Sequence, residues 1–118
     1  MNKYFLKLAQ DVEINALKKV TESLSGLHEV ERIIFFGSRV RGDFDGLSDM
    51  DLLIIITDIE IKNKIIEYLH DIELEFDVPL SPVIFTTKEY EINKKLKSSF
   101  IENVEKEGIV LYDSKHKG

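Results

Sequence analysis

Two short polar motifs, ten residues apart, carry the residue types that could do chemistry. Gly37 and Ser38 end one apolar run, and Asp49 and Asp51 open the next. A bare glycine lets a ligand approach the backbone closely, and a helical turn that begins near the serine directs its N–H groups at an anion. Aspartates one residue apart on a strand face the same side, where their charges repel unless a cation lies between them. The spacing therefore predicts an anion cradle beside a divalent-cation site.

The residues between the two motifs add positive charge. Arg39 follows the serine directly and Arg41 comes two residues later, and the planar guanidinium group suits phosphate oxygens. For each arginine the alternative is an ordinary solvated surface charge. Mg²⁺ prefers carboxylate oxygens and commonly completes its shell with substrate phosphates. Together the motifs favour binding of a magnesium–nucleoside triphosphate, while Asp43 and Asp45 are expected to be turn residues.

The apolar patterning predicts several strands that position these motifs. Runs rich in β-branched and aromatic residues predict strands at 32–36, 49–56, 82–85 and 109–112. Residues 74–80 alternate apolar and polar side chains, which predicts a further strand segment. Pro79 and Pro82 cannot donate to a ladder, so this segment is an edge strand or is broken into two pieces.

Helical spacing fills the stretches between the strands. The first helix spans residues 2–25 and ends at Gly26. Capping boxes, at Thr57 with Glu60 and at Thr86 with Glu89, each predict the start of a helix, the second of which continues through positions 96, 100 and 104. The fold class is therefore α/β, a small mixed sheet with helices mostly on one side.

Composition sets further bounds. A chain of 118 residues with 43% hydrophobic content is expected to form one domain. It has no cysteine, which suits a reducing cytosol and excludes disulfides and thiolate-bound metals. The net charge of −6 does not favour a long nucleic acid as a partner. We expect no signal peptide and no membrane span, hence a cytoplasmic protein, and leave a homo-oligomer open.

Gly37-Ser38, ten intervening residues and Asp49-x-Asp51 resemble the signature of the minimal nucleotidyltransferases, or MNT domains, of the polymerase-β-like superfamily. The resemblance covers residues 30–112. It implies a polymerase-β-like α/β (α+β) fold in a single domain, residues 1–118. Within it we expect an N-terminal helix at 1–27, a core at 30–112 and a tail at 113–118.

The resemblance also implies a reaction. A nucleoside monophosphate, with ATP as the expected donor, would pass to a hydroxyl acceptor with Mg²⁺ as the cofactor. Gly37 and Ser38 would hold the phosphates, and Asp49 and Asp51 the metal. Such enzymes usually carry a third aspartate on a neighbouring strand. Asp77 is the candidate here, with Glu75 as the alternative, although the end of the strand at 81–84 has no carboxylate.

The resemblance further implies a partner. At this length we expect no second domain for acceptor recognition, so the acceptor would come from another chain. Similar minimal nucleotidyltransferases are the antitoxin halves of two-protein systems whose partner is a helical ribonuclease of the HEPN type. The alternative is a catalytically weak module that neutralises a helical partner by contact. A small-molecule nucleotidyltransferase is disfavoured by the absent second domain.

Overall fold

The computed structural model describes residues 11–41 and 49–116 of the chain. No helix among them is long and apolar enough to cross a bilayer. In chain order the elements are α2 (Asp11–Ser25), β1 (Val30–Phe36), α3 (Ser38–Arg41), β2 (Met50–Ile56), η1 (Ile59–Ile61), α4 (Lys62–Phe76), β3 (Leu80–Thr86), α5 (Thr87–Lys95), α6 (Ser99–Glu107), β4 (Ile109–Asp113) and η2 (Ser114–His116).

The strands form one mixed sheet in the order β3-β2-β1-β4. β1 is antiparallel to both β2 and β4, whereas β2 and β3 are parallel and are connected through α4. The mixed sheet agrees with the sequence prediction. In the antiparallel β1–β2 pair, the end of β1 lies beside the start of β2. The pairing therefore brings the two polar motifs together.

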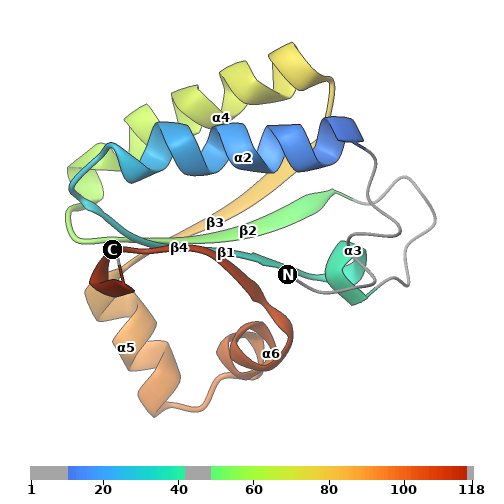
Figure 1. Ribbon diagram of the computed structural model, residues 1–118. Helices are drawn as coiled ribbons and strands as arrows, with labels where there is room; N and C mark the ends of the chain where they lie inside the picture. Colours follow the sequence, from blue (N-terminus) through green and yellow to red (C-terminus); the bar gives the residue numbers. More distant parts are fainter. Residues whose placement is uncertain (1–10, 42–48, 117–118) are drawn as a thin grey trace.

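Helices cover both faces of the sheet, so the prediction of helices mostly on one side is wrong. Figure 1 shows α2 and α4 over one face and α5 and α6 over the other. The cause is visible in β2, where Leu52 and Ile54 belong to the core cluster under α2 and α4, and Leu53 and Ile55 belong to the cluster under α5 and α6. A strand that is apolar on both sides must be buried on both sides.

The first helix confirms its predicted stripe in part. Ala16, Val20 and Leu24 are buried, and α2 ends at Ser25, one residue before Gly26. Val12 is 38% exposed, and its neighbour Glu13 is buried in its place. The predicted helical positions before residue 11 lie outside the described residues.

The predicted strand segment at 74–80 is wrong in its first half. α4 continues to Phe76, and Asp77 ends it in the left-handed conformation with φ 53°. The apolar stripe of α4, which includes Ile65, Leu69 and Ile72, extends at a four-residue step to Phe76, which packs against the same core. Helical packing therefore overrides the short period-two pattern, and β3 begins at Leu80.

The two predicted capping boxes have different outcomes. Thr86 and Glu89 cap α5 reciprocally, as predicted. At the other site Asp58, rather than Thr57, caps the short helix η1 by accepting a hydrogen bond from Glu60 N–H, and the Thr57 hydroxyl donates to the Glu29 carbonyl. A helix does follow Thr57, as predicted, but its N-terminal cap is Asp58.

The helix predicted to run from position 87 through position 104 is two helices. α5 ends at Lys95, Lys97 adopts a positive φ of 54°, and Ser98 caps α6 by accepting from Ile101 N–H. Leu96 is 75% exposed at this turn instead of buried. The break lets α6 return across the sheet, where Phe100 stacks edge-on against Phe36.

Candidate functional site

The end of β1 turns sharply at Gly37. This glycine has a φ of 95°, which a residue with a side chain rarely adopts. Its carbonyl accepts hydrogen bonds from the N–H groups of Val40 and Arg41, at 3.1 and 3.2 Å, and so closes the short helix α3 that begins at Ser38. We call Gly37 and Ser38 the phosphate corner. Residues 42–48, including the predicted turn residues Asp43 and Asp45, lie outside the described residues.

The phosphate corner touches one of the predicted acids. Phe36 pairs with Asp51 across the β1–β2 ladder, which places Gly37 beside the Asp51 side chain. A Cβ atom added to Gly37 would lie 2.2 Å from Oδ2 of Asp51. The absence of a side chain at position 37 is therefore what allows the backbone turn and this carboxylate to share one space.

The aspartate pair, Asp49 and Asp51, lies at the start of β2. Met50 and Leu52 face α2 and α4, so by alternation both aspartates face the side of α5 and α6. Burial raises the pKa of the Asp51 carboxyl, the negative charge of Asp49 raises it further, and the charge of Arg41 lowers it. A cation between the carboxylates would relieve this repulsion.

The donor set fits a Mg²⁺ ion that shares its shell with a substrate. Two hard carboxylate oxygens that face one way, with one of them partly desolvated, match what Mg²⁺ takes from proteins when phosphates complete its coordination. No group of three His, Asp or Glu side chains with metal-binding geometry occurs among the described residues. Within that part of the chain, Asp49 and Asp51 are therefore the two candidate ligands, and substrate and water would have to complete the shell.

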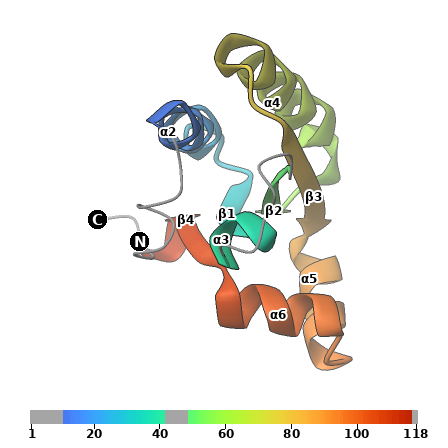
Figure 2. The same ribbon diagram turned by 90° about the vertical axis from the view of Figure 1, so that its right-hand side faces the viewer.

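The two predicted arginines turn to opposite layers of the molecule. Arg39 forms an ion pair with Glu13 of α2, and the Arg39 and Glu13 side chains are only 10% and 9% exposed. Arg41 forms an ion pair of 3.2 Å with Glu107 at the end of α6, where both side chains are partly exposed. Arg41 is also the arginine whose charge acts on Asp51. Figure 2 shows α3 at this end of the sheet, between the two helical layers.

Asp77 does not join the aspartate pair in the described structure. It is exposed and ends α4, which covers the opposite face of the sheet. The alternative, Glu75, lies within α4 and is exposed. The parallel β2–β3 register instead places Ser81 opposite Asp51. Because paired residues point to the same side of a sheet, the neighbouring-strand position beside Asp51 holds a hydroxyl group rather than a carboxylate.

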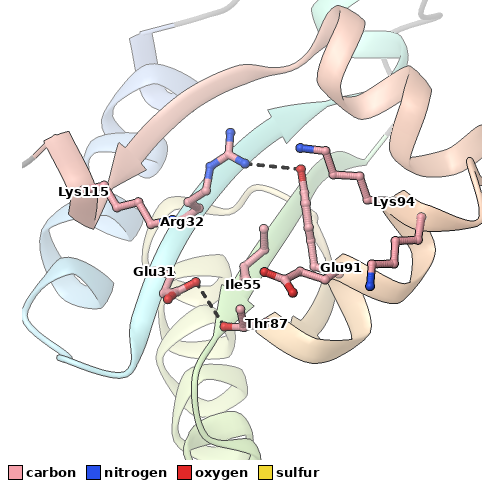
Figure 3. A pocket seen from close by; sticks show the side chains of 9 residues that line it. Glu31, Arg32, Ile55, Thr87, Glu91, Lys94 and Lys115 are labelled. Carbon is pink, nitrogen blue, oxygen red and sulfur yellow. Dashed lines mark hydrogen bonds between the residues drawn. The ribbon is translucent and has the colours of Figure 1, made fainter.

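A separate hollow of about 450 Å³ lies between α5 and the start of β1, toward the other end of the strands. Arg32 there donates to the Tyr90 hydroxyl at 3.3 Å, and the Thr87 hydroxyl donates to Glu31 (Figure 3). None of the residues predicted from the sequence to form the site lines this hollow. Its lining comprises Glu31, Arg32, Ile55, Thr87, Tyr90, Glu91, Lys94, Lys95 and Lys115.

Comparison with known proteins agrees with this geometry. The family described as "Polymerase beta, Nucleotidyltransferase" matches residues 18–117, a span that includes the phosphate corner, the aspartate pair and the whole sheet. The chain belongs to the polymerase beta nucleotidyltransferase family. The fold and the resemblance expected from the sequence are thereby confirmed.

Two relatives from Methanocaldococcus jannaschii are similar to this chain over most of their length. "Putative protein adenylyltransferase MJ0141" is 34% identical over 101 residues, covering 81% of this chain and 95% of the relative. "Putative protein adenylyltransferase MJ0604" is 33% identical over 102 residues, covering 85% and 98%. One chain of a solved complex, a tri-AMPylated Shewanella oneidensis HEPN toxin with MNT antitoxin, shares the fold with a TM-score of 0.52 at 17% identity, covering 88% of this chain and 74% of that one.

Sequence reasoning missed three residues that the structure places beside the predicted site residues. Glu13 and Glu107 pair with the two arginines from helices far away in the sequence, and Ser81 lies opposite Asp51. Glu13 lies in the buried stripe of α2, three residues before Ala16 and four before Leu17, and an acid at such a position was the available signal. Glu107 and Ser81 carry no such signal, because only the tertiary arrangement gives them neighbours.

Proposed function

We propose that the protein transfers AMP from ATP, with Mg²⁺, to a hydroxyl group on a partner protein. The observation that carries the proposal is the contact of the bare Gly37 backbone with the Asp51 carboxylate, because it joins an anion cradle to a metal-binding acid. The names of the two M. jannaschii relatives support protein as the acceptor and AMP as the transferred group.

In this proposal the chain positions charge and does little covalent chemistry. Gly37 and the first N–H groups of α3 hold the outer phosphates of ATP, and Arg41 neutralises charge on them. Asp49 and Asp51 hold Mg²⁺, which supplies charge stabilisation at the reacting phosphate. The acceptor oxygen forms a bond to the α-phosphorus, the bond to pyrophosphate breaks, and the hydroxyl proton is released to solvent.

The partner we propose is a HEPN-type helical protein, with this chain as the antitoxin. The solved complex of a tri-AMPylated HEPN toxin with MNT antitoxin supports this choice through the shared fold. Asp49 and Arg41 are both exposed, so a partner side chain could reach them.

The test is transfer of labelled AMP from ATP with Mg²⁺, in the presence of the co-purifying partner. We expect Asp49→Asn and Asp51→Asn to lose roughly 100-fold or more in rate, because charge at the phosphate would be left unneutralised. Asp71→Asn is the matched control, an exposed aspartate on α4 away from the site. Equal transfer by wild type and Asp51→Asn would contradict the proposal.

A second candidate function is neutralisation of the partner by contact alone. It is favoured by the hydroxyl at Ser81 and by the absence of a three-carboxylate group among the described residues. The same Asp51→Asn variant separates the two functions. If the variant transfers no AMP yet protects against the partner as well as wild type, contact is the mechanism.

A further inference from the structure

The predicted phosphate ligand Arg39 faces away from the aspartate pair. Its guanidinium group is paired with Glu13 of α2, and α2 covers the face of the sheet opposite to the one that Asp51 faces. Among the described residues, the charges that shift the pKa of Asp51 are those of Asp49 and Arg41. The two arginines of α3 therefore have different surroundings although only one residue separates them.

The Arg39–Glu13 pair between α3 and α2 is largely withdrawn from water. The Arg39 and Glu13 side chains are 10% and 9% exposed. Among the described residues, Glu13 is the one charged residue that is buried. Val40, between the arginines, is also buried in the core under α2. A buried carboxylate and guanidinium hold each other firmly, because either one left alone would be a desolvated charge without a partner.

We propose that Arg39 is a positioning residue: its ion pair with Glu13 fixes the phosphate corner against α2, and Arg39 does not contact the triphosphate. This inference rests on the proposed function, since it concerns the same site. It assigns phosphate contact to Arg41 and gives α2 a role in holding the corner still. A corner that is fixed before ATP arrives binds it without an ordering cost.

The first test is calorimetric titration of the full chain with a non-hydrolysable ATP analogue and Mg²⁺, and separately with AMP. Glu13→Gln removes the charge that pairs with Arg39 and leaves the Arg39 side chain unchanged. We expect about tenfold weaker binding of the analogue and little change for AMP, because only the outer phosphates reach the corner. Glu22→Gln, the same substitution elsewhere on α2, is the matched control and should bind like wild type. A phosphate-contacting Arg39 predicts the opposite for Glu13→Gln, since it would be released toward the ligand.

The second test replaces both charges. Arg39→Met alone removes the guanidinium group that pairs with Glu13 and should weaken binding of the analogue. Glu13→Leu/Arg39→Met should regain most of it, because apolar pairs often substitute well for buried ion pairs. Glu13→Gln/Arg39→Gln provides a second charge-free pair if the first does not fold. If a folded double variant binds the analogue as weakly as Arg39→Met, then Arg39 is a ligand contact and the inference is overturned.

The outcomes separate this inference from the proposed function. Wild type that binds the analogue and transfers AMP, with Glu13→Gln indistinguishable from it, overturns the inference and leaves the function standing. Wild type that binds the analogue without transferring AMP contradicts the function, and the binding pattern of the variants still decides the role of Arg39. Wild type that binds no analogue with its partner present overturns both.

Discussion

Replacement of Gly37 by alanine tests the contact on which the site depends. The new Cβ would lie 2.2 Å from Oδ2 of Asp51, where ordinary contact begins at 3.4 Å, so one of the two groups must move by about 1 Å. A displacement of about 1 Å at a reacting centre can cost about 100-fold in rate. The φ of 95° adds a backbone cost of about 1–3 kcal/mol for a residue with a side chain.

The assay compares AMP transfer from labelled ATP with urea unfolding of the same Gly37→Ala preparation. We expect about 100-fold slower transfer and a loss of about 1–3 kcal/mol in the free energy of unfolding. Gly26→Ala is the control, because its Cβ would meet nothing closer than 3.8 Å and its φ is not positive. It should transfer normally. A folded Gly37→Ala protein that transfers AMP at the wild-type rate would refute the reasoning.

Three further predictions follow from the charges around the corner. Because burial and then Asp49 raise the pKa of Asp51, the metal-free fold gains stability as the pH falls from that raised pKa toward the ordinary value for aspartate. Urea melts across acidic pH should lose this dependence in Asp51→Asn. Ser81→Asp places a carboxylate opposite Asp51; it should lower metal-free stability by about 0.2–1 kcal/mol and strengthen Mg²⁺ binding in calorimetry. Arg41→Gln should raise the KM for ATP about tenfold in steady-state assays, through loss of a charged contact. Glu107→Gln, which removes only the carboxylate of the Arg41–Glu107 ion pair, should not raise it.

Most of the fold could be predicted because local signals agree with the tertiary structure. The strands around the two motifs are long apolar runs. The turn between the sheet and α3 is at Gly37, whose positive φ is a backbone conformation that residues other than glycine rarely adopt. The spacing from Gly37 to Asp51 needed only a hairpin-like return of the chain to bring the motifs together. For these elements the sequence period and the packing lead to the same structure.

The failures lie where packing decides between two local patterns. Leu74 and Phe76 fit both a strand and the end of a helix, and the core under α4 selects the helix for Phe76. Leu96 fits the apolar stripe of one long helix, but the chain breaks there and leaves Leu96 exposed. Both wrong predictions, the strand at 74–80 and the single helix through position 104, used only the spacing of apolar residues. That spacing does not say how long a helix must be to cover the sheet.

The candidate site shows the same limit. The residues at fixed spacing, Gly37 and Asp51, could be paired from the sequence, and the structure brings them into contact. The third acid could not be placed, because the position depends on the β2–β3 register, which puts Ser81 beside Asp51 and leaves Asp77 on α4. The β2–β3 register is set by contacts between segments that are distant in the sequence, so neither segment alone predicts it.

The two borders of the sheet differ in their capacity to accept another strand. β3 forms one border and carries Pro82, whose ring nitrogen has no hydrogen to offer an incoming chain. Among the described strands β4 forms the other border, pairs with β1 on its inner side, and leaves Val110 49% exposed. Annealing of an extended peptide, whether from a companion molecule or from a misfolded copy, should therefore begin at β4 rather than at β3.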